Sequence, residues 1–253
     1  MSDAPWNSIF EKYEIGKHDF DEKPFVLTAK QIKLATSHYE NTAEKEVRIL
    51  CKQDTRESRP TIFKEKGLFI LPIKNGIFAL IKGEGYIDIP KIETEPIPYR
   101  YSLDFPLETS LVGNSEMQHL DFAYAASLIR TFLNDSSLVL TIRGRKYTPK
   151  LSFRVGEHLI ETISVQTEVD AGYEGRNQVV LIEAKNSKTK NTVIRQLYYP
   201  FRQWQMYTQK KVNTLFFEKQ GNNYSLWEFT FDDINDYNSI RLVKSTRFNI
   251  ILD

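Results

Sequence analysis

Two short segments, VQTEVD at 165–170 and VVLIEAK at 179–185, decide the fold of this chain. The second segment opens with four β-branched or aliphatic residues and holds no Gly or Pro, which is typical of a buried central strand. Between them, 171–177 contains two glycines and an asparagine, the composition of a hairpin loop. We therefore expect two adjacent strands that bring Asp170 and Glu183 to the same region of a sheet.

Charged side chains gather where these two strands end. Side chains alternate along a strand, so Glu183 and Lys185 point to the same face, and Glu168 shares a face with Asp170. Two carboxylates and an ammonium are costly to gather beside a buried strand unless they are paired or bind a cation. The sequence therefore predicts a site made of Asp170, Glu183 and Lys185, with Glu168 as a supporting group or an extra ligand.

The spacing Asp-x12-Glu-x-Lys resembles the signature of the PD-(D/E)xK nuclease superfamily, which includes most type II restriction endonucleases. Val169 stands where the name-giving proline would be. The strings IEAKN at 182–186 and RQLYYP at 195–200 resemble a subgroup of bacterial type II restriction enzymes. A helix that begins after Asn191 or Thr192 completes the strand–hairpin–strand–helix order of the superfamily core.

This resemblance implies Mg²⁺-dependent hydrolysis of phosphodiester bonds in double-stranded DNA. Asp170 and Glu183 would bind Mg²⁺, and Lys185 would position or polarise the attacking water. The residue types suit that chemistry, because Mg²⁺ takes hard oxygen ligands and keeps several waters. A bound Mg²⁺ activates a water and neutralises charge on the scissile phosphate.

Three further residues have both a functional and an ordinary explanation. Glu116 begins a helix predicted over 115–133 and resembles a helical glutamate near the metal of the superfamily, but a first-turn Glu is also favoured by the helix dipole. Arg195 and Gln196 follow the Glu-x-Lys at the distance of a helix glutamine in some branches. They would contact a phosphate or orient water, or else form a helix surface pair.

The net charge of +1 conceals an uneven distribution of basic residues. Five Lys and Arg side chains fall between 143 and 154, where no acid occurs, and a second basic run extends from 185 to 211. Such runs beside a carboxylate site fit a polyanion whose backbone must be neutralised, although solvated surface faces have the same composition. The residues predicted to contact DNA are Arg143, Arg145, Lys146, Lys188, Arg195 and Gln196.

Composition favours an enzyme of the cytoplasm. No apolar run approaches the roughly 18 residues of a membrane helix, and the first residues lack the features of a secretory leader. The single cysteine, Cys51, excludes an internal disulfide and a cysteine zinc cluster. No glycine-rich phosphate loop is present, so we expect no nucleotide cofactor.

The remaining segments predict an α/β (α+β) protein with a mixed central sheet flanked by helices. Near the amino terminus the expected elements are a helix capped by Thr28, a strand or helix at 46–52, a helix at 61–66, and a hairpin around Asn75-Gly76. Helices before a hairpin indicate either a winged-helix-like DNA-reading unit or the edge of one larger fold.

We divide the chain into a recognition region at 1–95 and an endonuclease domain at 96–253. The predicted protein is a type II restriction endonuclease, and because a palindromic target mirrors a two-fold axis, we expect a homodimer. Two alternatives stay open: a repair or recombination nuclease of the same superfamily, and a non-catalytic DNA-binding regulator with a degenerate core.

Overall fold

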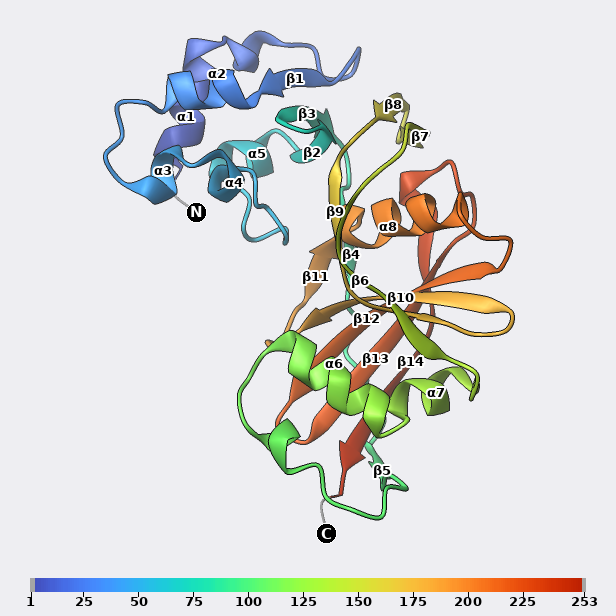
Figure 1. Ribbon diagram of the computed structural model, residues 1–253. Helices are drawn as coiled ribbons and strands as arrows, with labels where there is room; N and C mark the ends of the chain where they lie inside the picture. The colour runs from blue at the N-terminus through green and yellow to red at the C-terminus, as the bar shows by residue number, and fades with distance from the viewer. Residues whose placement is uncertain (1–2, 252–253) are drawn as a thin grey trace.

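The structure is a computed structural model that describes residues 3–251; Met1, Ser2, Leu252 and Asp253, at the outer ends of the two predicted domains, lie outside the described residues. A seven-stranded mixed sheet forms the centre, and helices cover both of its faces (Figure 1). The predicted α/β class is confirmed. None of the helices in the described range is long and apolar enough to cross a membrane.

The central sheet has the strand order β5-β14-β13-β12-β10-β9-β6. Its strands are β5 (Ile97–Tyr99), β6 (Val139–Tyr147), β9 (Gln166–Glu174), β10 (Gln178–Lys185), β12 (Lys211–Gln220), β13 (Asn223–Phe231) and β14 (Ile240–Ile250). β10 runs parallel to β12 and antiparallel to β9. The hairpin of β9 and β10 therefore lies inside the sheet, with a partner strand on either side.

Two separate cores hold the helices against the sheet. Helix α8 (Arg195–Gln205) packs Leu197 and Phe201 on the face that contains Val179 and Leu181 of β10. Helices α6 (Glu116–Ala125) and α7 (Leu128–Leu133) pack on the opposite face. Because β10 is buried on both sides, it has the continuous apolar run expected of a central strand.

The hairpin loop is shorter than predicted. β9 continues to Glu174, which pairs with Val179, so the loop is 175–177 and not 171–177. Tyr173 is fully buried and its ring stacks on that of Tyr124 at 5.1 Å. This packing against α6 keeps the chain extended through residues whose composition favours a turn.

Two predicted helices also have different limits. The helix predicted over 115–133 breaks between α6 and α7 at Ser127, where φ is +60° and the preceding carbonyl of Ala126 accepts a hydrogen bond from Tyr99. After β10, Asn191–Val193 form the short strand β11, which pairs with β4 (Tyr86–Asp88). The side chain of Asn191 binds the loop 56–57, so it does not cap α8.

The amino-terminal part has its own core and a three-stranded sheet in the order β1-β3-β2. Its elements are α1 (Ala4–Lys12), η1 (Ile15–Lys17), β1 (Phe25–Thr28), α2 (Ala29–Ala35), α3 (Thr42–Lys45), α4 (Val47–Leu50), α5 (Thr61–Glu65), β2 (Leu68–Lys74) and β3 (Ile77–Lys82). The predicted cap of α2 is confirmed, since Thr28 and Gln31 form a reciprocal capping box. The Asn75-Gly76 hairpin is also confirmed.

The strand interpretation of 46–52 is wrong. These residues form α4, with Val47 and Leu50 buried in the amino-terminal core. The amide of Leu50 donates to Glu46, and that of Cys51 donates to Val47. In the sequence, the apolar residues at 47, 49, 50 and 51 fit either period, and in the structure the packing of neighbouring helices selects the helix.

The remaining small elements lie outside the central sheet. They are the hairpin β7 (Leu151–Val155) and β8 (His158–Thr162), and the short helices η2 (Glu108–Leu111) and η3 (Tyr237–Ser239). The loop after α4 connects the two parts of the chain. The carbonyl of Asp54 accepts from the amide of Val193 at 2.8 Å, and the amide of Arg56 donates to Asn191 Oδ1 at 2.7 Å.

Candidate active site

The ends of β9 and β10 bring the three predicted site residues together. The antiparallel ladder ends with the pair of Ala171 and Ile182, and Asp170 and Glu183 are the next residues beyond it on the two strands. Asp170 Oδ2 accepts a hydrogen bond from the amide of Ala184 at 2.8 Å. The backbone of one strand thus fixes the carboxylate of the other.

An irregularity in the sheet lies at Asp170. In the pairing of β6 with β9, Ile142 faces Gly172, but Gly144 faces Val169, so three steps along β9 match two along β6. Gly144 has φ +78°, which a residue with a Cβ adopts only with strain. Register shifts of this kind re-aim side chains next to active sites. The extra residue of β9 lies next to the point where Asp170 meets Glu183.

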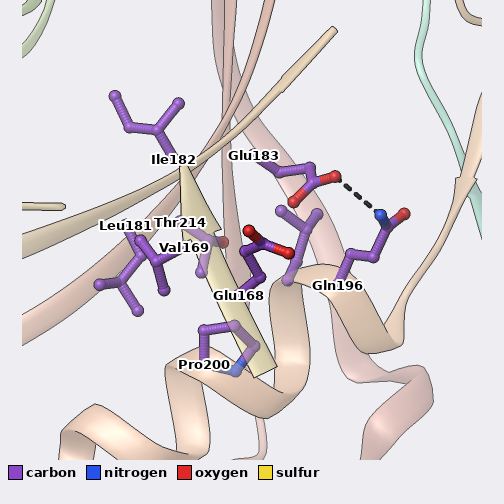
Figure 2. A pocket seen from close by; sticks show the side chains of 9 residues that line it. Glu168, Val169, Leu181, Ile182, Glu183, Gln196, Pro200 and Thr214 are labelled. Carbon is purple, nitrogen blue, oxygen red and sulfur yellow. Dashed lines mark hydrogen bonds between the residues drawn. The ribbon is translucent and has the colours of Figure 1, made fainter. Parts of the chain in front are cut away.

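Glu183 is bound from two sides. Lys185 Nζ forms an ion pair with Glu183 Oε1, and Gln196 Nε2 of α8 donates to the same oxygen at 2.7 Å (Figure 2). Thr192 Oγ1 in turn donates to Gln196 Oε1 at 3.0 Å. Gln196, predicted to contact a phosphate or orient water, binds the Glu183 carboxylate in the structure.

Burial controls the protonation of Glu183. Only 8% of this residue is exposed. Loss of water raises the pKa of Glu183 to about 7, with the nearby Lys185 ammonium opposing the rise and the Asp170 carboxylate adding to it. A buried carboxyl with its pKa in this range is typical of a functional group.

The pKa values of Asp170 and Lys185 are also shifted by burial and by neighbouring charges. Burial raises the pKa of Asp170, the Ala184 amide and Lys185 oppose the rise, and the charges of Glu116 and Glu168 reinforce it. For Lys185, burial would lower the pKa, but the charge and hydrogen bond of Glu183 outweigh it, so the pKa lies above its ordinary value. Lys185 is therefore a charged ammonium at neutral pH.

These residues form one wall of an open cleft with a volume of about 790 Å³. Glu116, Glu168, Asp170, Glu183 and Lys185 all line it. Glu116, the first residue of α6, thus lines the same cleft as the central triad. The side chain of Glu168 also reaches the cleft and forms an ion pair with Arg145 at 3.2 Å.

The donor set of this wall fits a magnesium ion. Among residues 3–251, no group of three His, Cys, Asp or Glu side chains is arranged to hold a metal by itself. Mg²⁺ does not require such a group, since it keeps several waters and binds through one or two carboxylates. Asp170 and Glu183 are two hard oxygen donors beside open cleft volume, and both would be ionised in the bound state.

Acids from other segments balance the first basic run. Arg143 is half-buried and pairs with Asp121 of α6, and its Nη1 also contacts Met117 Sδ at 3.5 Å. The other ion pairs are Arg145 with Glu168, Lys150 with Glu161 and Arg154 with Asp233. A segment that contains no acid can therefore still be surrounded by acids from other segments, and the Arg143 guanidinium is paired with Asp121.

The other predicted DNA contacts lie in varied surroundings. Lys188 is exposed in the loop after β10, and Lys146 Nζ lies 5.8 Å from the ring centre of Trp204. Arg195 lines the cleft, where its Nη2 lies 3.2 Å from Asp54 Oδ1. Of Lys146, Lys188 and Arg195, Arg195 is the residue that lines the cleft, but its guanidinium is already paired with the Asp54 carboxylate.

The comparisons with known proteins give a family. The model of a domain of unknown function, DUF6997, matches residues 81–249. The chain belongs to this family. A second model, that of the domain of unknown function DUF6996, matches residues 3–80. The two matches meet within β3, whereas the predicted division at 95/96 falls between β4 and β5.

The other comparisons add little to the DUF6997 assignment. No curated protein matches the chain. A solved structure described as the crystal structure of SSO0001 is 14% identical, with a TM-score of 0.18. That match covers 53% of this chain and 51% of the other, so this chain spans about half the length of that protein. A TM-score this low carries no argument about fold or function.

The DUF6997 part contains all the site residues predicted from the sequence, but the DUF6996 part supplies the opposite wall of the cleft. Arg48, Lys52 and Asp54 line it there, and sequence analysis did not single them out. A helical interpretation of 46–52 would have placed Arg48 and Lys52 on one face, away from the apolar positions Val47 and Leu50. The spacing of these two cations on one helical face was the sequence signal that could have identified them as site residues.

Proposed function

We propose that this protein is a Mg²⁺-dependent endonuclease that cleaves double-stranded DNA at a specific sequence, as a type II restriction endonuclease does. The observation that supports this most is the meeting of Asp170, Glu183 and Lys185 at the end of β10, facing a cleft. A buried carboxylate and a half-buried one beside a charged ammonium are a costly arrangement, and metal-dependent phosphodiester hydrolysis is a use for each group.

Each side chain has a distinct task in this proposal. Asp170 and Glu183 would hold the metal, which when bound supplies positive charge against the scissile phosphate and lowers the pKa of water. Gln196 fixes the orientation of Glu183 through its 2.7 Å hydrogen bond. Lys185, kept charged by Glu183, contributes an ammonium that attracts the phosphate and orients the attacking water.

The amino-terminal part is assigned to DNA recognition. Its order of helices followed by the β2–β3 hairpin, with β1 alongside β3, is compatible with a winged-helix-like unit. A palindromic target would require two copies of the chain related by a two-fold axis. Light scattering of the purified protein, alone and with DNA, tests the homodimer.

Plasmid cleavage tests the proposed activity. The full chain is incubated with plasmid DNA in Mg²⁺ or in EDTA, together with Asp170→Ala and Glu183→Ala. Glu157→Ala is the matched control, because Glu157 is an exposed acid in the β7–β8 turn. We expect discrete bands from the wild type and the control in Mg²⁺, and no cleavage by the other two variants, which still bind DNA.

The alternative functions predict different results. A smear, or cuts that depend on junctions or ends, indicates a repair or recombination nuclease that uses the same site. DNA binding without metal-dependent cleavage by the wild type refutes the enzyme and indicates a regulator. Near-normal cleavage by Asp170→Ala or Glu183→Ala refutes the site.

A further inference from the structure

The cleft has a second wall, which comes from the amino-terminal part of the chain. Arg48, Cys51, Lys52 and Asp54 line it from α4 and the following loop, opposite the carboxylates at the end of β10. In Figure 1 this loop reaches toward β11 and the start of α8. Hydrogen bonds from Val193 and to Asn191 hold it there, so the position of the second wall is fixed relative to the site.

The packing of α4 determines which side chains face the cleft. Val47 and Leu50 are buried in the amino-terminal core, and Cys51 is also buried. Arg48 and Lys52 are four residues apart and both exposed. The amide of Lys52 donates to Ile49, so the helical turn continues through this position. The two cations therefore extend from the same side of the turn.

These two cations carry most of the unbalanced positive charge in the cleft. Lys185 is paired with Glu183, and Arg195 with Asp54. Lys52 reaches Asp54 only at 3.8 Å, with 73% of its side chain exposed. Within the described part of the chain, the Arg48 side chain has no ion pair or hydrogen bond, and it is exposed. Exposed ion pairs of the Lys52 kind contribute little and exchange easily for another anion.

The two walls are thus oppositely charged across open space. Acids and the proposed metal ligands lie on one wall, and Arg48 and the weakly paired Lys52 lie on the other. A neutral or cationic ligand would gain nothing from the Arg48 wall, and a single anion would be repelled by the carboxylates. A chain of phosphates fits both walls, since one phosphate can bind the cations while a neighbour lies near the carboxylates.

We propose that Arg48 and Lys52 bind a backbone phosphate of the nucleic acid strand that enters the cleft, and so clamp that strand against the Asp170–Glu183 wall. This inference rests on the proposed function for the identity of the bound strand. It assigns backbone contact to α4, and it leaves reading of the base sequence to other parts of the chain.

The test compares two double variants that lose the same charge. Arg48→Ala/Lys52→Ala removes the cationic wall, and Arg176→Ala/Arg241→Ala removes two exposed arginines, one in the β9–β10 loop and one in β14, that do not line the cleft and lie outside the recognition region. Binding of a labelled DNA duplex is measured by fluorescence anisotropy in EDTA over a range of salt. A further variant, Arg48→Lys/Lys52→Arg, keeps both charges, and melting temperatures verify that each variant is folded.

Two lost phosphate contacts reduce the slope of log affinity against log salt by about two. Between about 50 and 200 mM salt, this makes the affinity of the wild type fall roughly 12-fold more than that of the cleft variant. We expect this change only in Arg48→Ala/Lys52→Ala. An unchanged slope in that variant, or an equal change in the Arg176→Ala/Arg241→Ala control, overturns the inference.

The same proteins separate this inference from the proposed function. If the wild type cleaves DNA in Mg²⁺ and the cleft variant keeps the full slope, the clamp is wrong and the nuclease stands. If the wild type binds DNA with a slope that the cleft variant loses, but never cleaves, the phosphate contact is supported and the nuclease is wrong. If the wild type does not bind DNA, both are wrong.

Discussion

Replacing Glu183 by Gln removes a buried carboxyl group whose pKa is raised to about 7, from an ordinary value of 4.5. The folded protein holds this proton up to about pH 7, whereas the unfolded chain releases it near 4.5. Stability from the neutral form is therefore complete below pH 4.5, declines as the pH rises, and is lost above 7. The pKa of Glu183 therefore differs by about 2.5 between the folded and unfolded states. At about 1.4 kcal/mol per pKa unit, this difference corresponds to about 3 kcal/mol of stability.

Urea unfolding without divalent ions measures this effect. We expect the free energy of unfolding of the wild type, minus that of Glu183→Gln, to fall by about 3 kcal/mol between about pH 4.5 and 7.5. The amide of the variant does not titrate, so the difference isolates Glu183. Glu157→Gln serves as the control, because Glu157 is exposed. Parallel curves for the wild type and Glu183→Gln would refute the burial argument.

Three further predictions concern the neighbours of Glu183 and the basic run. Lys185→Ala should lower the single-turnover cleavage rate by several orders of magnitude, while calorimetry still detects Ca²⁺ binding. Lys185→Arg should not restore the rate, because a guanidinium is wider than an ammonium, and a near-normal rate in this variant would contradict the prediction. Gln196→Ala should raise the pKa of Glu183 by about 1, measured by carboxyl NMR, since a hydrogen bond to a charged group contributes about 1.5–3 kcal/mol. Gln166→Ala, in the same cleft, should leave the pKa of Glu183 unchanged. Equal shifts in the two variants would be evidence against the hydrogen bond between Gln196 and Glu183. Arg143→Ala should lower the free energy of unfolding by about 1 kcal/mol and Arg145→Ala by much less, because only Arg143 is half-buried against its partner; the reverse order in urea unfolding would contradict the assignment.

Local patterns predicted the parts of the fold that depend on neighbours in sequence. The β9–β10 and β2–β3 hairpins and the capping box at Thr28 all involve residues close together along the chain. The same holds for the central site, because a hairpin brings Asp170 to Glu183 without any knowledge of the rest of the fold. The positions of the strand ends and the alternation of side chains along each strand were sufficient to predict this site.

Contacts between distant segments could not be predicted in this way. The acid that pairs with Arg143 lies on α6, and Asp54 meets Arg195 from the other part of the chain. Asn191, a suitable cap by composition, is used instead by the loop 56–57. The second wall of the cleft was missed for the same reason: residue type alone does not say which segment will face the carboxylates.

The loop after α4 has a consequence for evolution and engineering. Its Asp54 carbonyl binds the amide of Val193, and its Arg56 amide binds Asn191, just before the helix that carries Gln196. A graft of residues 3–80 onto a relative would transfer only one half of this hydrogen-bonding pattern. The bond between the two backbone groups can form with any residues, but the Arg56 amide needs an Asn at position 191. Exchange of the amino-terminal part onto a chain without that side chain would leave the Arg56 amide unmatched, so we expect residues 56–57 and 191 to change together.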